Sequence, residues 1–238
     1  MSKADWLFIP GTLCDGRVFA PLIQHLGQTA SGSIRVVQAL DKDDLSALAH
    51  RAVEGLGARI HVVGFSLGCQ VAFEIMRQAP DRCAGITLIS TTARPDTPDL
   101  APDRRAMVNR FQCDGAAALV EADLWPRYVA EPQRPGHPAK DLIHSMAHET
   151  PSSHLAAQIE LAIGRPDSRP ALSCLDAPVL MINGQEDRLT PVDLGAEIAS
   201  TARNGMHSVI PAAGHFVLLE EPEATAAVIH TWVRGLNQ

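Results

Sequence analysis

The chain has 238 residues, a formal net charge of −7 and 46% hydrophobic residues. This length suits one large α/β domain, or a domain with a modest insertion, around a substantial buried core. The acidic balance and the lack of any basic run argue against nucleic acid as a partner.

The ends and the cysteines give no sign of secretion or of a membrane anchor. The apolar stretch before Pro10 has only four residues, and no apolar run reaches the length of a membrane span. The five cysteines are scattered and contain no CxxC pair, so neither a disulfide framework nor a zinc ribbon is indicated. We expect a soluble cytoplasmic protein with no membrane partner.

Short apolar, β-branched segments alternate with helical segments in the first 90 residues. Strands are expected at residues 5–9, 34–38, 60–64 and 85–90, and helices at 17–26, 45–56 and 69–79. This alternation predicts right-handed βαβ crossovers and an α/β fold with a doubly wound, mostly parallel sheet. Ligands of such a sheet bind beyond the carboxyl ends of its strands.

The alternation stops between residues 94 and 170, where prolines separate helical segments. The candidate helices are 103–112, 114–125, 139–149 and 153–164. We interpret residues 94–170 as an inserted helical cap, or lid, and residues 1–93 and 171–238 as the core. Large apolar groups of the cap, such as Trp125 and Tyr128, are suited to roof a pocket, and packing between cap helices explains them equally well.

The strand and helix pattern resumes after the expected cap. Strands are expected at 178–183 and 207–210, and a terminal helix at 222–234. Between the two strands, Thr190 is the expected N-cap of a helix that has Pro191 at its first position. The whole sheet is therefore predicted to have about six strands.

A glycine-flanked serine stands between the third strand and its helix. In the segment Gly64-Phe65-Ser66-Leu67-Gly68, the sharp turn is expected to give Ser66 a positive φ, and the glycines leave room where strand and helix nearly collide. The pattern occurs by chance in roughly one chain of this length in fifteen. It therefore needs partners elsewhere in the sequence.

Two later loops supply such partners. Asp187 follows a strand with the spacing Gly184-x-x-Asp187, and His215 follows the next strand in the pair Gly214-His215. The order serine, aspartate, histidine, with these local contexts, resembles the α/β-hydrolase superfamily over nearly the whole chain. Two features depart from the family pattern: the chain lacks the N-terminal hairpin, and Pro10 replaces the histidine common at the oxyanion loop.

The resemblance implies a catalytic triad. Ser66 would be the nucleophile, His215 the general base, and Asp187 the group that fixes the histidine tautomer. Glu186 and Asp193 are nearby acids that do not occupy the family's position.

The resemblance also implies an oxyanion hole and a pocket. The backbone N–H of Leu67 would be one donor, and the family's spacing places the second at Thr12, with Leu13 as the alternative. Leu13, Phe65 and Phe216 flank these residues in sequence, so the reacting end of the pocket is expected to be largely apolar.

The sequence thus predicts an enzyme, a serine hydrolase of the carboxylesterase type. It would cleave an ester-type bond of a small, largely apolar substrate through an acyl-enzyme on Ser66, without a cofactor. A lactonase, a carbon–carbon bond hydrolase or a thioesterase could use the same triad. An alternative of another class is a ligand receptor with slow or vestigial hydrolysis.

Two other groups of residues are candidates for a functional role. His144 and His148 lie four residues apart on a predicted helix, but the spacing lacks the HExxH pattern, and a solvated helix face is the simpler interpretation, so no metal site is expected. Cys14 and Cys69 adjoin the predicted site in sequence and are expected to be small packing residues.

Overall fold

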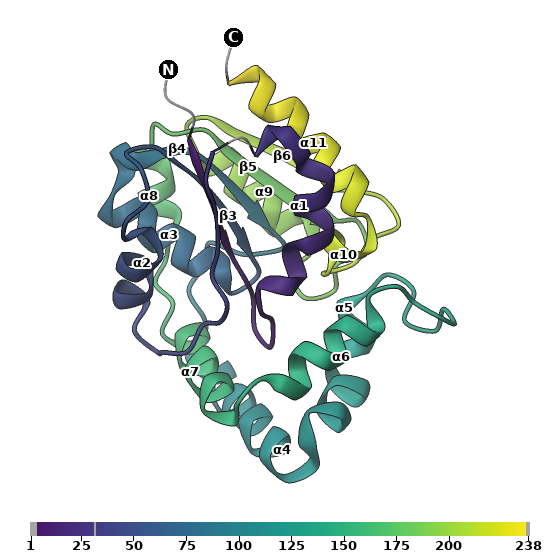
Figure 1. Cartoon of the computed structure of the whole chain (residues 1–238). Coiled ribbons are helices and arrows are strands. Elements are labelled where there is room, and N and C mark those ends of the chain that lie inside the picture. Colours follow the sequence, from purple (N-terminus) through teal and green to yellow (C-terminus); the bar gives the residue numbers. More distant parts are fainter. Residues whose placement is uncertain (1–3, 31, 237–238) are drawn as a thin grey trace.

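A six-stranded parallel sheet forms the centre of the molecule in the computed structural model, which describes residues 4–30 and 32–236 (Figure 1). The strand order is β2-β1-β3-β4-β5-β6, and each pairing between these neighbours is parallel. The strands are β1 (Asp5–Ile9), β2 (Ile34–Val36), β3 (Ile60–Phe65), β4 (Cys83–Ile89), β5 (Val179–Gly184) and β6 (Gly205–Ile210). The predicted doubly wound α/β fold is confirmed.

Helices cover both faces of the sheet, because strand residues alternate between two apolar clusters. Trp6 and Phe8 of β1 pack with one cluster, and Leu7 and Ile9 pack with the other. The first cluster includes residues of α1 (Ala20–Leu26), α10 (Val217–Glu220) and α11 (Pro222–Gly235). The second includes residues of α2 (Leu45–Val53), α3 (Gly68–Gln78), α8 (Arg169–Cys174) and α9 (Val192–Thr201).

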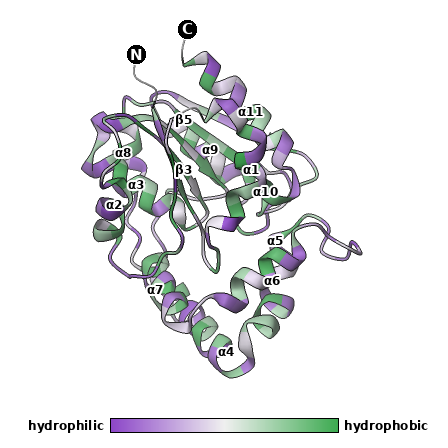
Figure 2. Ribbon diagram, viewed as in Figure 1, coloured by the Kyte–Doolittle hydropathy of each residue, from purple (hydrophilic) through white to green (hydrophobic). Residues whose placement is uncertain are grey.

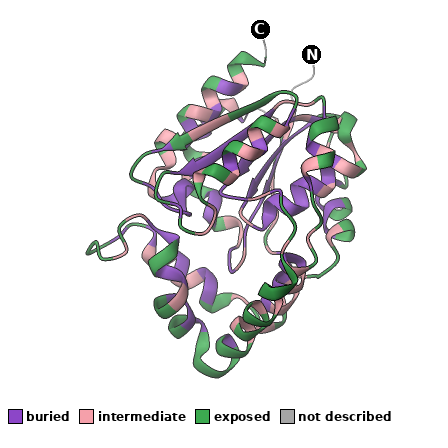
Figure 3. Cartoon of the chain, turned by 180° about the vertical axis from the view of Figure 1, so that it is seen from behind, coloured by how far each residue is buried: buried purple, intermediate pink, exposed green. Residues whose placement is uncertain are grey.

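The colouring of the ribbon agrees with this layered arrangement. Figure 2 shows hydrophobic residues along the strands and on the helices that cover them, and Figure 3 shows that the strands are largely buried. None of the described helices is long and apolar enough to span a membrane.

Residues 94–170, called the helical segment below, connect β4 to β5. They contain α4 (Ala101–Leu119), a π-helical turn (Val120–Leu124), α5 (Trp125–Tyr128), α6 (Lys140–Glu149) and α7 (Ser152–Ile163). In Figure 1 these helices lie below the sheet as a separate group. Within α4, Gly115 has φ 84° and kinks the helix, close to the break expected between residues 112 and 114.

The helix after β5 begins differently from the prediction. α9 starts at Val192, and Pro191 occupies its N-cap position without a side-chain hydrogen bond. Thr190 does not cap the helix, because its hydroxyl donates to the Oδ2 atom of Asp187 at 2.7 Å. The predicted capping role of Thr190 is therefore wrong, and the correction bears on the site.

Candidate active site

Ser66 lies on a sharp turn at the carboxyl edge of the sheet, between β3 and α3. Its φ is 50°, in the left-handed region that L-residues rarely occupy. The backbone holds this conformation, since the Ser66 N–H donates to the carbonyl of Ile89 at 2.8 Å. A Cβ at Gly68 would lie 2.1 Å from the carbonyl oxygen of Ile9, so only glycine fits there.

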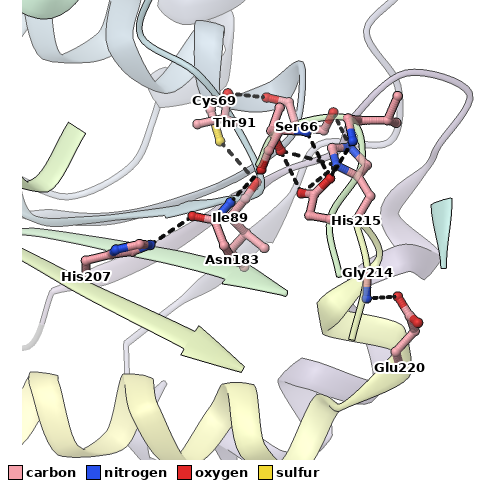
Figure 4. Close-up of polar contacts among 12 residues, drawn as sticks. Ser66, Cys69, Ile89, Thr91, Asn183, His207, Gly214, His215 and Glu220 are labelled. Carbon is pink, nitrogen blue, oxygen red and sulfur yellow. Dashed lines mark hydrogen bonds and ion pairs between the residues drawn. The ribbon is translucent and has the colours of Figure 1, made fainter. Parts of the chain in front are cut away.

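Ser66, His215 and Asp187 form a continuous hydrogen-bonded chain (Figure 4). The Nε2 atom of His215 lies 2.9 Å from the Oγ atom of Ser66. On the other side of the ring, Nδ1 lies 3.0 Å and 3.1 Å from the two carboxylate oxygens of Asp187. With Nδ1 protonated, the imidazole donates to Asp187 and leaves Nε2 free to accept the serine proton.

The carboxylate of Asp187 is buried, and both of its oxygens accept hydrogen bonds. Its Oδ1 accepts the N–H groups of Leu189 and Thr190, each at 2.9 Å, and its Oδ2 accepts the Thr190 hydroxyl. Burial alone would raise its pKa, but the His215 charge and these hydrogen bonds hold the pKa of Asp187 below its ordinary value. The carboxylate is therefore negatively charged at neutral pH.

Asn183 and His207 hold the loop that carries Asp187 through further hydrogen bonds. The Nδ2 atom of Asn183 donates to the carbonyl of Thr190 at 3.0 Å, and its Oδ1 lies 3.0 Å from Nε2 of His207 (Figure 4). The hydrogen bond from Thr190 to the acid was not predicted from the sequence. The Asp-x-x-Thr spacing, typical of a local side-chain turn, was the available signal.

Two of the three residues predicted for the oxyanion hole line the cavity around Ser66. Leu67 directly follows the serine at the start of α3, and Thr12 lies in the loop after β1; both line the cavity around Ser66. Leu13 does not line this cavity, because its side chain packs in the core, 3% exposed. Its N–H donates to the Oε1 atom of Gln158, on α7, at 3.0 Å. The interpretation of Leu13 as a pocket residue is corrected accordingly.

The cavity that holds the serine has a volume of about 930 Å³. Its aromatic wall surrounds the histidine: ring centroids of Phe65 and Tyr128 lie 5.4 Å and 6.0 Å from that of His215, and Phe65 and Phe216 are 5.0 Å apart. Residues of the helical segment complete the lining, and five arginines and two aspartates are among the lining residues. The end of the cavity near Ser66 has the expected aromatic side chains, whereas the rest of the lining also contains charged side chains.

The remaining candidate residues have structural roles. Burial raises the pKa of the Cys14 thiol well above its ordinary value and that of the Cys69 thiol to about 12, so both stay protonated. The Nε2 atom of His144 lies 3.2 Å from a carboxylate oxygen of Glu121. In the described ranges 4–30 and 32–236, no group of three or more histidine, cysteine or acidic side chains is arranged to hold a metal.

Comparisons with known proteins agree with this architecture. A family model described as the alpha/beta hydrolase fold matches residues 25–222. A pimeloyl-[acyl-carrier protein] methyl ester esterase of Methylococcus capsulatus is 31% identical over 195 residues, which cover 79% of this chain and 76% of the relative. The malate-bound structure of an esterase from Thermogutta terrifontis, 26% identical, superposes with a TM-score of 0.89 over 100% of this chain and 92% of that chain. An enol-lactonase from Burkholderia xenovorans, 20% identical, shares the fold, with a TM-score of 0.81 over 98% of this chain and 92% of that chain.

Proposed function

The chain belongs to the α/β-hydrolase family, and we propose that it is a serine esterase that forms an acyl-enzyme on Ser66. The family match and the esterase relatives establish a hydrolase, with ester cleavage as its best-supported activity. The observation that carries the proposal is the hydrogen-bonded chain from Ser66 through His215 to Asp187, at the wall of a large cavity.

In the proposed acylation step, the Oγ atom of Ser66 attacks the ester carbonyl while Nε2 of His215 accepts the hydroxyl proton. The tetrahedral intermediate collapses, the carbon–oxygen bond breaks, and the imidazolium returns the proton to the leaving alcohol. Water then attacks the acyl-enzyme while His215 accepts its proton. When this second tetrahedral intermediate collapses, the bond to Ser66 breaks, His215 returns the proton to the Oγ atom of Ser66, and the acid leaves. Throughout, Asp187 accepts a hydrogen bond from the Nδ1–H group of His215 and stabilises the imidazolium.

We assign the oxyanion hole to the N–H groups of Leu67 and Thr12. Both residues line the cavity, and neither N–H has a partner within the described part of the chain. The N–H of Leu13 is the weaker candidate, because Gln158 already accepts it. Ser66 also adjoins the N-terminus of α3, whose partial positive charge favours the developing oxyanion.

The helical segment, residues 94–170, is the proposed cap on a core formed by residues 1–93 and 171–238. Its support is the lining of the cavity, to which Met107, Leu124 and Ile159 contribute opposite the core residues around Ser66. A cap of this kind would exclude water and select the substrate.

A panel of small esters, lactones and thioesters tests the proposed activity directly. Because the curated relatives are named for a methyl ester, the panel includes methyl esters of increasing chain length. We expect many turnovers per enzyme molecule with at least one ester class. A single covalent event without turnover would instead favour a ligand receptor. Selective turnover of lactones or of thioesters would show that the enzyme is a lactonase or a thioesterase and not an esterase.

A further inference from the structure

The cavity around Ser66 carries an excess of positive side chains, although the whole chain has a net charge of −7. Its charged lining residues are Arg104, Arg110, Arg127, Arg165 and Arg188, with Asp103 and Asp123.

Three of these arginines are neutralised in part by carboxylates. Asp96, which is not a lining residue, pairs with both Arg104 and Arg165, and Asp123 pairs with Arg110. Asp103 also lines the cavity, so three carboxylates balance these three guanidinium groups, and the positive excess comes from the other two arginines.

The other two arginines have no carboxylate partner among the described residues. The Nε atom of Arg127 donates to the carbonyl of Asp123 at 2.9 Å. The Nη1 atom of Arg188 donates to the carbonyls of Pro126 and Val129, each at 3.1 Å. Backbone carbonyls therefore hold both guanidinium groups in place without cancelling their charge.

Both arginines line the cavity and adjoin, in sequence, a residue that contacts His215. Arg188 follows Asp187 directly, and Arg127 precedes Tyr128, whose ring stacks on that of His215. A guanidinium group presents paired N–H donors that match the two oxygens of a carboxylate. Building on the proposed esterase function, we propose that the substrate is an ester with a second, free carboxylate, which Arg127 and Arg188 bind.

Matched pairs of esters test this preference. The first pair, monomethyl adipate and methyl hexanoate, differs by a carboxylate in the acyl part. The second pair, 4-acetoxybenzoate and 4-tolyl acetate, differs by a carboxylate in the leaving alcohol. We expect kcat/KM to favour the charged member of at least one pair by about tenfold, and Arg127→Gln and Arg188→Gln each to reduce that ratio.

The ratio of kcat/KM for the charged ester to kcat/KM for the neutral ester separates loss of carboxylate recognition from general damage to the site. If Arg188→Gln displaced Asp187, kcat/KM would fall for both esters and the ratio would not change. Arg105→Gln is the matched control, because Arg105 lies on α4 beside Arg104, pairs with Glu160 and does not line the cavity. Turnover of neutral esters without preference for either charged ester, or a preference unchanged in both arginine variants, would overturn this inference and leave the esterase proposal intact. Failure to hydrolyse any ester would defeat the esterase proposal itself.

A separate set of contacts ties the histidine loop to the helical segment. Glu220, on α10, is buried, with a side chain 4% exposed. Its Oε1 atom accepts the N–H of Gly214 at 2.9 Å (Figure 4), and its Oε2 atom accepts the N–H of Ala130 at 2.7 Å. One carboxylate therefore links the residue before His215 to the chain that follows α5.

The residue after His215 is tied to the same stretch. The N–H of Phe216 donates to the carbonyl of Tyr128 at 3.0 Å. A Cβ at Gly214 would lie 2.7 Å from the carbonyl carbon of Val129, so the two backbones are in close contact. The geometry assigns Glu220 as a positioning residue, which fixes His215 relative to residues 128–130.

The surroundings of Glu220 give this contact a pH dependence. Burial raises the pKa of Glu220 to about 7 from its ordinary 4.5. His137 faces Oε2 at 3.8 Å, the charges of His215 and Asp187 act on the carboxylate, and Arg188 donates to the carbonyl of Ala130. Between about pH 4.5 and 7, Glu220 keeps its proton in the native state and loses it in the unfolded state. The contribution of Glu220 to the free energy of unfolding therefore declines as pH rises towards 7.

Glu220→Gln tests the positioning role, because the amide keeps the size of the side chain but replaces one acceptor oxygen with a donor. We expect kcat for a good ester to fall between about tenfold and a hundredfold, with KM within about twofold of its original value. The deshielded proton resonance of the His215 Nδ1–H, identified by its loss in Asp187→Asn, should shift or broaden. The decline of stability between about pH 4.5 and 7 should flatten.

Glu221→Gln is the matched control, since its carboxylate bonds neither the histidine loop nor residues 128–130 in the described structure. Glu220→Asp, which keeps the charge but shortens the reach, should give an intermediate loss of kcat and serves if the glutamine variant does not fold. A folded variant of either kind with native kcat and an unshifted His215 resonance would refute the positioning role.

Discussion

Ser66→Ala is expected to lower kcat for ester hydrolysis by about 10⁶-fold, the scale of loss when the nucleophile of a serine triad is removed. The hydroxyl at 2.9 Å from His215 Nε2 is the nucleophile of the proposed reaction, and alanine leaves no group that can form the acyl-enzyme. The turn itself should survive, because the positive φ of Ser66 is held by backbone contacts. Initial rates with the best ester of the panel, and circular dichroism, measure both expectations.

Ser208→Ala provides the control for this variant. Ser208 lies on β6 and does not line the cavity, so its rate should stay within about twofold of the original protein. A Ser66→Ala protein that keeps more than about a tenth of the original activity would show that another group carries the reaction.

Asp187→Asn is expected to lower kcat by about 10⁴-fold while the protein stays folded. The amide has the shape of the carboxylate, but its NH₂ group can face Nδ1 of His215 as a donor. The imidazole then carries its proton on Nε2 and cannot accept the proton of Ser66. The N–H groups of Leu189 and Thr190 still have the amide oxygen as acceptor, which preserves the loop.

Glu186→Gln is the natural comparison for that experiment. Glu186 precedes Asp187 and is exposed, so neutralising it should change kcat by less than about twofold. An equal loss in both variants, or a fully active Asp187→Asn protein, would remove Asp187 from the proposed mechanism.

The sheet could be predicted from the sequence because buried parallel strands are continuous apolar, β-branched runs, and most of them are followed by helical spacing. The segments around β3, β4 and β5 carry this signal within their own residues. The strained turn at Ser66 was likewise predictable, since the glycines on either side of it leave few alternatives.

Contacts between distant residues could not be predicted in the same way. Gln158 bonds Leu13 across 145 positions, and Glu220 bonds Ala130 across 90, and no local pattern marks either pair. The five arginines of the cavity come from well-separated parts of the sequence, so no local pattern brings them together. Thr190 was predicted to cap the helix that follows it, whereas its hydroxyl donates to the carboxylate of Asp187.

Mass spectrometry of the protein quenched with acid during turnover of 4-nitrophenyl butyrate can detect the proposed acyl-enzyme on Ser66. An activated aryl ester acylates faster than a typical acyl-enzyme hydrolyses, so the intermediate should accumulate. We expect a butyryl group on the peptide that contains Ser66, a burst of nitrophenol equal to the enzyme concentration, and neither signal in Ser66→Ala. Rapid turnover with an unmodified Ser66 peptide, or with the acyl group on another residue, would contradict this proposal.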